Sequence, residues 1–232
     1  EKEKTEKIRR EFTANVSHEL KTPLTTISGY AQMISNGMAK TEDIKEFGRK
    51  IEKESDRLLT LIDDIINLSN LDEQGSIENP ENIDLSLVTE EAICVLEKAA
   101  KERGIQIYYT KIPTFIKGNV TLVSELVYNL LDNAIKYNKD NGKITVFVGE
   151  SAKGVELSVK DTGIGIPPED TERIFERFYR VDKSRSKKVG GTGLGLSIVK
   201  HVCACHNATI RVKSKVGKGT TIYVTFPNNV NN

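Results

Sequence analysis

Apolar side chains in the first 72 residues recur at steps of three and four, which is the periodicity of an amphipathic α-helix. A first helix is expected to end near Gly37, because glycine readily takes the left-handed conformation that terminates helices. A second helix begins at Thr41, a candidate N-cap that precedes Glu42 and Asp43 in the positive first turn. The apolar seam consists of Ile8, Phe12, Val16, Leu20, Ile27, Ala31 and Ile34 in the first helix, and of Ile44, Phe47, Ile51, Leu58, Leu61, Ile65 and Leu68 in the second.

Two such helices joined by a short loop predict an antiparallel helical hairpin. The seam of the second helix is heptad patterning, broken only at Glu54. A single hairpin would leave much of the seam in water, so two copies are expected to pair into a four-helix bundle. We therefore expect an all-α hairpin that forms a homodimer.

The stretch "NVSHELKTPLTT", residues 15–26, places polar groups and a proline inside the first helix. His18 lies about 200° round the helix from the seam positions two residues away on either side, so it is expected to face water. Glu19 adjoins His18, and Thr22 lies one turn further along the same face. Pro23 costs a helix interior ~3 kcal/mol, and we expect it to loosen or kink the helix just after His18. Taken alone, the stretch favours a solvated polar face over a chemical site.

After residue 72 the pattern becomes a mixture of alternating strands and amphipathic helices, which predicts an α+β two-layer sandwich. The first helix of this part is expected to be capped at Ser86 and ended by Gly104, and a short strand precedes it. Further strands are expected at residues 105–110, 143–149, 154–161, 209–214 and 220–227, and further helices at residues 119–138 and 195–206.

Glycine, proline, asparagine and serine cluster between residues 72 and 82, which predicts a linker between the two parts. We therefore expect the helical hairpin to occupy residues 1–74, the linker residues 75–82, and the sandwich residues 83–232.

The 232-residue chain is 38% hydrophobic and 29% charged, as is ordinary for a soluble globular protein, and its formal net charge is +1. This near-neutral balance gives no electrostatic reason to expect nucleic acid or an anionic membrane as the main partner. The longest apolar runs are too short and too polar to span a bilayer. The chain opens on charged, helix-favouring residues without a helix start signal, so we expect it to be a fragment of a longer protein.

The three cysteines, Cys94, Cys203 and Cys205, make a poor disulfide framework and suggest a reducing, cytosolic setting. Cys203 and Cys205 lie near His201 and His206, which raises a metal site as an alternative. The spacing matches neither a CxxC motif nor a histidine pair one turn apart, so core and surface positions of a helix are the favoured interpretation.

The stretch "NLLDNAIKY" places Asn129 and Asn133 one turn apart on the same helix face, followed by Lys136 and Tyr137. Amide oxygens are suitable ligands for Mg²⁺, and a lysine can hold phosphate as a point charge. Taken alone, a polar helix face turned to solvent explains the same residues.

Two glycine-rich stretches follow. In "DTGIGIP", Asp161 ends a strand, and Gly163 and Gly165 let the backbone approach a flat ligand. A carboxylate here can accept a hydrogen bond from the amino group of adenine, which distinguishes adenine from guanine. In "GGTGLGLSIV", glycine N–H groups open a helix and form a ready anion site. This second stretch lacks the GK[ST] ending of a P-loop and the preceding strand of a dinucleotide fold.

The stretch "FERFYRVDKSRSKKV" between them is rich in arginine and lysine, with Phe175, Phe178 and Tyr179 spaced through it. A mobile surface loop is one interpretation. The other is a lid over a triphosphate, in which Arg180 reaches a terminal phosphate and the aromatic side chains dock the lid. Each motif is weak by itself, but all of them in this order indicate a nucleotide site.

Five stretches together resemble the cytoplasmic core of a sensor histidine kinase of a bacterial two-component system. "FTANVSHELKTPLTTISGY" resembles that family's H-box, "NLLDNAIKY" its N-box, "VKDTGIGIP" its first glycine box, "IFERFYRVD" its F-box and "GGTGLGLSIVKH" its second glycine box. The resemblance runs from about residue 10 to residue 227 and includes the spacing between the boxes. It implies a dimerisation and histidine-phosphotransfer hairpin, followed by a catalytic ATP-binding domain of the Bergerat type. Gyrase, mismatch-repair ATPases and heat-shock chaperones share that ATP-binding fold.

The resemblance also implies roles for particular residues. His18 would be the phosphoacceptor and Glu19 its acid/base partner, and Thr22 would position water when a phosphorylated partner is dephosphorylated. Asn133, with Asn129 nearby, would hold Mg²⁺. The implied nucleotide-binding residues are Asn129, Asn133, Lys136, Tyr137, Asp161, Gly163, Gly165, Ile166, Tyr179, Arg180, Gly191, Thr192, Gly193, Leu194, Gly195, Leu196 and Thr220.

The implied function is ATP-dependent autophosphorylation on His18 and phosphoryl transfer to an aspartate of a response regulator receiver domain, with phosphatase activity toward the phosphorylated regulator. ATP and Mg²⁺ are the implied cofactors. The family usually has transmembrane helices, so the chain is expected to be a cytoplasmic fragment of a bacterial membrane protein that meets the membrane only through a missing N-terminal part. Family members often carry a Gly-Gly pair after the last helix, where this chain has Asn207 and Ala208. Asparagine tolerates the left-handed conformation, so the turn is expected to survive.

Two other classes of protein fit part of the pattern. An ATP-binding pseudokinase would signal by shape alone, but Asn133, Asp161, both glycine boxes and the pairing of His18 with Glu19 argue against it. An ATP-driven clamp of the gyrase or chaperone kind uses a glutamate to activate water at the position where this chain has Asn129, and it lacks the histidine hairpin.

Overall fold

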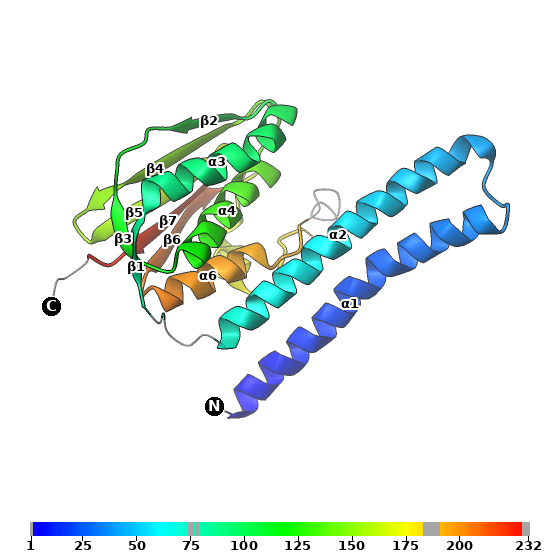
Figure 1. Ribbon diagram of the computed structural model, residues 1–232, viewed down its shortest axis with the longest axis horizontal. Coiled ribbons are helices and arrows are strands. Elements are labelled where there is room, and N and C mark those ends of the chain that lie inside the picture. The colour runs from blue at the N-terminus through cyan, green and yellow to red at the C-terminus, as the bar shows by residue number, and fades with distance from the viewer. Residues whose placement is uncertain (1, 74–76, 78, 183–190, 229–232) are drawn as a thin grey trace. The chain divides into compact units, whose positions relative to one another are not determined.

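The computed structural model describes residues 2–73, 77, 79–182 and 191–228 of the chain (Figure 1). The backbone divides into two compact units, Glu1–Asn67 and Leu68–Asn232. The domain limits expected from the sequence, 1–74 and 83–232 with a linker between them, stay a prediction. No helix within the described ranges combines the length and the apolar character that crossing a bilayer requires.

The first unit is the expected helical hairpin, made by α1 (Lys2–Ser35) and the larger part of α2 (Thr41–Glu73). The end of α1 is set by Gly37, whose φ of +65° is left-handed. Two backbone hydrogen bonds close the turn: Met38 donates to the carbonyl of Met33 at 3.0 Å, and Gly37 donates to the carbonyl of Ile34 at 3.2 Å. This is the bond pattern of a Schellman motif, so the predicted helix end is confirmed.

The two helices of the hairpin contact each other through long side chains. The rings of Tyr30 and Phe47 lie 5.0 Å apart near the turn, and Lys50 Nζ lies 5.3 Å from the Tyr30 ring centroid. Most of the predicted seam positions whose side chains are described are half-buried or buried. Ala31 in α1 is exposed, however, and Ile44 in the first turn of α2 is 43% exposed, so the expected places of these two residues in the buried seam are wrong. Ile44 lies beside the interhelical loop, where little of the facing helix remains to cover it.

A second apolar stripe on α2 is exposed in the single chain. Leu59, Ile62 and Ile66 are 60%, 38% and 51% exposed and follow one another at steps of three and four. An apolar stripe of this kind on a helix is typical of a surface that packs against another helix.

Pro23 does not interrupt α1, which is a continuous helix across it. Nearby hydroxyl groups donate to carbonyls one turn back: Thr22 to His18 at 3.1 Å, Thr25 to Lys21 at 2.8 Å, and Thr26 to Thr22. Back-bonding of this kind can bend a helix, and a bend at Pro23 stays a prediction.

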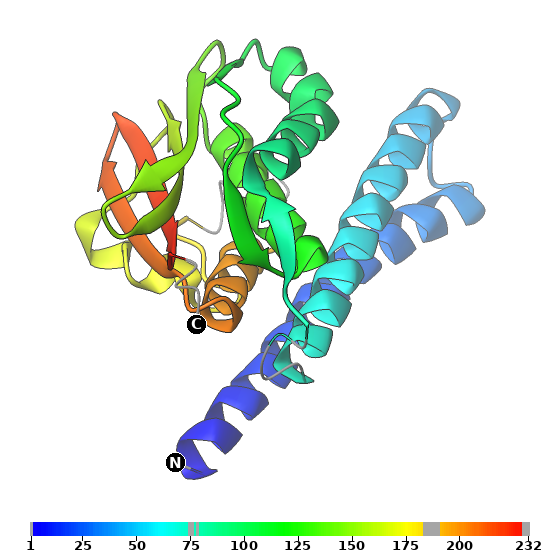
Figure 2. The ribbon, with the colours of Figure 1, turned by 60° about the vertical axis from the view of Figure 1, so that its left-hand side comes forward.

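The second unit is a two-layer sandwich, and the predicted fold class is confirmed (Figure 2). Its mixed five-stranded sheet has the order β2-β4-β5-β7-β6, and β2 pairs with β4 in parallel while the other neighbours are antiparallel. Figure 2 shows helices α3, α4 and α6 on one face of this sheet. The strands are β2 (Gln106–Tyr109), β4 (Lys143–Ser151), β5 (Gly154–Asp161), β6 (Thr209–Lys215) and β7 (Gly219–Phe226), and the helices are α3 (Leu85–Glu102), α4 (Val120–Lys136) and α6 (Gly195–Cys205).

A separate two-stranded antiparallel sheet joins β1 (Glu81–Asp84) to β3 (Phe115–Gly118). The sequence did not predict β3, because its four residues include only Ile116 and Gly118 as buried positions, too few for a periodic signal. Two short 3₁₀ turns, Pro168–Asp170 and Arg173–Phe175, were not expected either.

The N-cap of α3 is Asp84, so the expected cap at Ser86 is wrong. The Asp84 carboxylate accepts from the backbone N–H groups of Ser86 at 3.0 Å and Leu87 at 3.3 Å, and from the Ser86 hydroxyl. A carboxylate satisfies two backbone donors here, whereas the Ser86 hydroxyl is itself used as a donor. Burial opposes the charge on Asp84, but these bonds outweigh it and hold its pKa below the usual value.

Helix α6 is followed by Asn207 and Ala208, which stand where members of the family often carry a Gly-Gly pair. Asn207 has a left-handed φ of +52°, and Ala208 donates to the carbonyl of Cys203 at 2.8 Å. The turn therefore has the geometry that a glycine would give it, and the prediction that it survives is confirmed.

Candidate active site

The H-box residues lie on α1, and their side chains take different directions. His18 is exposed, as predicted, whereas Glu19 is half-buried with its Oε2 3.6 Å from a guanidinium nitrogen of Arg57 on α2. The Thr22 hydroxyl donates to the carbonyl of His18. Both proposed helpers of His18 are therefore engaged elsewhere in this structure.

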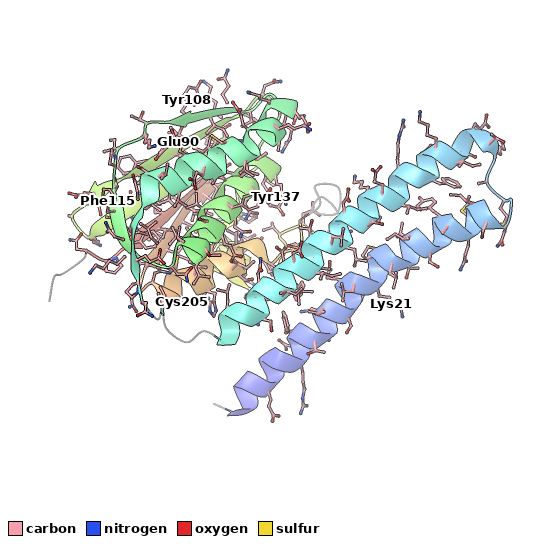
Figure 3. The ribbon with its side chains drawn as sticks, in the orientation of Figure 1. Lys21, Glu90, Tyr108, Phe115, Tyr137 and Cys205 are labelled. Carbon is pink, nitrogen blue, oxygen red and sulfur yellow. The ribbon has the colours of Figure 1, made fainter. Side chains whose placement is uncertain are left out.

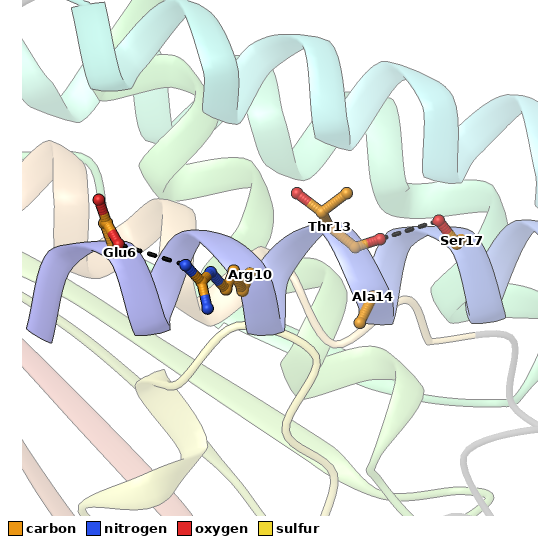
Figure 4. Close-up of a pocket in the computed structure, with 5 residues that line it drawn as sticks. All are labelled: Glu6, Arg10, Thr13, Ala14 and Ser17. Atoms are coloured by element: carbon orange, nitrogen blue, oxygen red, sulfur yellow. Dashed lines mark hydrogen bonds and ion pairs between the residues drawn. The ribbon is translucent and has the colours of Figure 1, made fainter. Parts of the chain in front are cut away.

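A hollow also runs along α1 beside this segment (Figure 4). Among the described residues, the side chains that line it are exposed and belong to α1, and Arg10 Nη2 lies 3.4 Å from Glu6 Oε2 within it. The residues that line it are Glu6, Arg10, Thr13, Ala14 and Ser17. None of them is among the predicted site residues.

The N-box residues lie on one face of α4. The Asn129 amide nitrogen donates to the carbonyl of Glu125, and the Asn133 amide nitrogen donates to the carbonyl of Asn129, both at 2.9 Å. These bonds fix both amide nitrogens on the helix backbone, which leaves the amide oxygens as the ligand atoms. Lys136 Nζ lies 2.7 Å from the Asp132 carboxylate, so a phosphate would have to compete with that ion pair.

The start of α6 packs closely on this face. A Cβ added at Gly195 would lie 2.6 Å from Asn129 Oδ1 and 3.5 Å from Asn133 Nδ2. The second glycine box is therefore brought directly against the N-box, and a side chain at position 195 would push them apart.

Tyr137 directly follows the end of α4 (Figure 3). It contacts both glycine boxes. Its carbonyl accepts from the N–H of Ile164 at 3.1 Å, and Gly163 packs against the same carbonyl. A Cβ added at Gly191 would lie 2.8 Å from the Tyr137 hydroxyl. Both boxes thus converge on one residue of the N-box.

Asp161 lies at the end of β5, and its Oδ1 accepts from the backbone N–H groups of Gly163 at 2.7 Å and Thr220 at 3.2 Å. Burial raises the pKa of Asp161, and these two N–H groups partly offset that effect. Because both bonds reach Oδ1, Oδ2 is the oxygen that a ligand can use. The arrangement suits a carboxylate that accepts one hydrogen bond from a base.

The turn after Asp161 is tied to the end of β6. Gly165 has a left-handed φ of +70°. The N–H of Ile166 donates to the Ser214 hydroxyl, which also lies 2.8 Å from the hydroxyl of Thr220. Asp161 and Ile166 are brought together here with Thr220, which lies more than 50 residues further along the chain.

The F-box is hydrogen-bonded to the second glycine box. The N–H of Phe178 donates to the carbonyl of Gly193 at 2.8 Å, and Arg180 donates to the carbonyl of Thr192 at 2.9 Å. Phe178 has a φ of +63°, a strained value for a bulky residue that this contact maintains. Gly193, at φ +78°, packs against the Phe178 backbone, where a side chain could not fit.

Tyr179 donates its hydroxyl to Asp170, and the guanidinium of Arg173 lies 4.2 Å from its ring centroid. Its predicted nucleotide contact would require it to leave these partners. Leu194 is fully buried and Leu196 half-buried at the start of α6. Residues 183–190, which include the second half of the predicted lid, lie outside the described residues.

Two residues with a structural role at the site were not predicted from the sequence. One is Arg57, described above, and the other is Arg103 at the end of α3. Arg103 donates to the carbonyls of Ile135, Lys136 and Asn138 and lies 3.1 Å from Asp140 Oδ1, so it caps the end of α4. An arginine just before a helix-ending glycine is a common cation at a helix end, and nothing in the sequence indicates carbonyls more than 30 residues away as its partners.

Asn138 extends this connection to the first glycine box. It is buried, its amide oxygen accepts from the Thr162 hydroxyl at 3.2 Å, and its amide nitrogen donates to the carbonyl of Lys143. Arg103 is thus linked through Asn138 to the residue that follows Asp161.

The cysteine and histidine cluster agrees with core and surface positions on α6. Cys203 is buried and Cys205 half-buried, and burial raises the pKa of the Cys203 thiol to about 12. His206 is buried with Nδ1 2.8 Å from the carbonyl of Val202, and its Nε2 accepts from the N–H of Asn119 at 3.2 Å. His206 is therefore a neutral core residue that joins the end of α6 to the start of α4.

Two family models match the chain. The model described as "His Kinase A (phospho-acceptor) domain" matches residues 8–74, and the one described as "Histidine kinase-, DNA gyrase B-, and HSP90-like ATPase" matches residues 118–230. The sensor-like histidine kinase SenX3 of Mycobacterium tuberculosis is 39% identical over 224 residues, which is 96% of this chain and 54% of SenX3. The solved structure of the mycobacterial sensor histidine kinase MprB is 32% identical with a TM-score of 0.55, over 64% of this chain and 97% of that one. The chain belongs to the sensor histidine kinase family.

A further solved structure shares the fold of this histidine kinase chain. It is that of the histidine kinase ThkA in complex with the response regulator protein TrrA, with 24% identity and a TM-score of 0.77, over 99% of this chain and 64% of that one. The chain spans about half the length of the curated relatives it matches. The ATPase family model covers every predicted nucleotide-binding residue, and the phosphoacceptor model covers His18, Glu19 and Thr22. ATP is therefore the nucleotide that this family membership indicates.

Proposed function

We propose that this chain is an ATP-dependent protein-histidine kinase that phosphorylates His18 and passes the phosphoryl group to an aspartate of a response regulator. The observation that carries the proposal is the convergence of both glycine boxes on α4, the helix of the N-box. Both glycine boxes meet Tyr137, Gly195 abuts Asn129, and Asp161 follows on β5. The other half of the reaction needs an accessible acceptor, and His18 is exposed on α1.

We assign the nucleotide contacts from the donors and acceptors around this junction. Asp161 Oδ2 would accept from the amino group of adenine, while Gly163 and Gly165 allow the base to approach the backbone. Lys136 would exchange Asp132 for a phosphate oxygen, and Arg180 would stabilise negative charge on the phosphates. The amide oxygens of Asn133 and Asn129 fit Mg²⁺, which when bound neutralises charge on the phosphates.

The phosphoryl transfer uses groups of the first unit. A nitrogen of the neutral His18 imidazole forms a bond to the γ-phosphorus, and the bond from that phosphorus to the β–γ bridging oxygen breaks, releasing ADP. The other imidazole nitrogen gives up its proton, which Glu19 accepts. The product is a labile phosphoramidate that suits onward transfer to a carboxylate.

We infer that a receiver domain is the partner, because the complex of ThkA with TrrA shows that a kinase of this fold binds a response regulator. In the reverse direction, we propose that the Thr22 hydroxyl leaves the His18 carbonyl and positions water for dephosphorylation of the regulator. The exposed stripe of Leu59, Ile62 and Ile66 supports a homodimer. A membrane location of a longer parent protein stays a prediction.

The test is to incubate the chain with Mg²⁺ and γ-labelled ATP, in parallel with a His18→Gln variant. We expect label that is labile in acid, stable in base and absent from the variant, because only the phosphoramidate has that chemistry. Label that persists in His18→Gln would contradict the assignment of the acceptor. ATP binding without any label would contradict the kinase and favour a pseudokinase, and ATP hydrolysis without label would favour an ATP-driven clamp.

A further inference from the structure

The carboxylate of Glu19 is held between the two helices of the hairpin. Its Oε2 lies 3.6 Å from Nη2 of Arg57, and Nη1 of the same guanidinium lies 3.6 Å from Oε2 of Glu54. The Arg57 side chain is 14% exposed, and those of Glu19 and Glu54 are 25% and 24% exposed. The three side chains therefore form a half-buried cluster in which one arginine serves two carboxylates.

This placement conflicts with the role proposed for Glu19. Successive residues of a helix point about 100° apart, so neighbouring side chains do not face each other unless one of them leans across. His18 is exposed to solvent, whereas Glu19 leans toward α2. The group that would take the imidazole proton is thus turned to a cation on the other helix.

We propose that Arg57 is a positioning residue that withholds the Glu19 carboxylate from His18 and so limits the rate of autophosphorylation. The inference rests on the proposed function, because it concerns the proton acceptor of that reaction. The ion pair joins α1 to α2, so any shift of one helix along the other changes how firmly Arg57 holds Glu19. A signal that repacks the hairpin would then change the rate of autophosphorylation without altering the nucleotide site.

Glu54 allows the proposal to predict opposite changes in rate for two different substitutions. The planar guanidinium offers one nitrogen to each carboxylate, so Glu54 and Glu19 compete for the same charge. Removing the charge of Glu54 leaves the guanidinium of Arg57 to Glu19, whereas removing Arg57 takes that cation away from Glu19. The two changes therefore act on the reaction in opposite directions.

The test measures the initial rate of His18 labelling by the whole chain as ATP is varied. For Arg57→Ala we expect kcat to rise about threefold to fivefold, or about 0.6 to 1 kcal/mol at 1.36 kcal/mol per factor of ten, with the KM for ATP unchanged. For Glu54→Gln we expect kcat to fall by a similar factor. Arg57→Lys keeps a positive charge near Glu19, so its kcat is expected to stay within about twofold of the parent chain.

Double variants separate this role from a merely structural one. Adding Glu54→Gln to Arg57→Ala is expected to have no further effect, because the shared cation is gone. Adding Arg57→Ala to Glu19→Gln is expected to bring no acceleration, because the released group can no longer accept a proton. Melting temperatures are measured for every variant alongside the rates.

An Arg57→Ala variant with an unchanged or lower kcat would overturn the inference. So would a parallel loss of rate in Arg57→Ala and Glu54→Gln that follows their melting temperatures, since that is the result of a packing role. If His18 is labelled and none of these variants changes the labelling rate, the inference is overturned but the proposed function is not. Absence of label from the parent chain would overturn the proposed function and the inference with it.

Discussion

Burial disfavours the charged form of two side chains in the second unit and so shifts their pKa values in opposite directions. Burial raises the pKa of Asp161 at the nucleotide site, whereas burial lowers the pKa of His206, an effect that its bond to the Val202 carbonyl only partly opposes. Both of the His206 ring nitrogens are used: one faces a carbonyl and the other accepts from a backbone N–H. A protonated ring would turn a donor toward the N–H of Asn119.

A pH dependence of stability follows from His206. Because its folded pKa lies below the unfolded value of 6.5, the unfolded chain binds more protons as the pH falls below that value. The free energy of unfolding of this unit should therefore decrease on acidification from pH 7.5 to pH 5, by at most about 1.4 kcal/mol per pH unit from this group. Denaturant unfolding at each pH measures it.

The matched control for this dependence is a His206→Gln variant, which lacks the titrating group. Its unfolding free energy is expected to be lower at neutral pH but to vary less between pH 7.5 and pH 5. Equal pH dependence in the two proteins would contradict the assignment to His206. Comparison of the two also removes the contribution of Asp161, whose raised pKa acts with the opposite sign at lower pH.

At the level of elements, the nucleotide site depends on the hydrogen bonds by which Arg103, after the end of α3, contacts carbonyls at the end of α4. Arg103 satisfies carbonyls that α4 cannot satisfy itself, next to Lys136 and Tyr137. An Arg103→Met variant should lose about 2 kcal/mol of unfolding free energy and bind ATP several-fold more weakly, because charged hydrogen bonds are lost and the N-box end is released. Thermal unfolding and equilibrium ATP binding measure the two effects.

Lys101→Met provides the control, since Lys101 forms an ion pair with Glu97 across the exposed surface of the same helix. Such a pair contributes little, so both stability and ATP affinity should stay near those of the parent chain. An Arg103→Met variant with the same ATP affinity as Lys101→Met would contradict the proposed link between Arg103 and the nucleotide site.

The elements also show what a sequence can and cannot predict. Helix and strand periodicity depends on nearest neighbours along the chain, so the hairpin, the long helix α4 and the central strands were predictable. Partner choice between distant segments is not periodic, and for that reason neither Arg103 on the α4 carbonyls nor Arg57 beside Glu19 was foreseen. The cap at Asp84 was missed because Asp84 and Ser86, two residues apart, both suit an N-cap, and only the turn geometry decides between them.

At the scale of the whole molecule, the exposed stripe on α2 predicts the state of assembly. Changing Ile62→Glu would place a charge in the proposed dimer interface, so we expect the dissociation constant of the dimer to rise at least about tenfold. Light scattering coupled to size-exclusion chromatography measures the mass. Val95→Glu is the control, because Val95 is a singly exposed apolar residue on α3 and its change should leave a dimer intact. Equal mass profiles for the two variants would contradict an interface at Ile62.

The strand order of the second unit has a consequence for synthesis of the chain. Strand β5 pairs with β7, which is the last strand of this sheet in chain order, so the sheet cannot be completed before Phe226 has left the ribosome. The helical hairpin has no such requirement, since its two helices are neighbours in sequence. Domains fold as units from the N-terminus during translation. A nascent chain therefore presents His18 well before it can hold a nucleotide, and phosphorylation of the histidine has to wait until β7 has emerged.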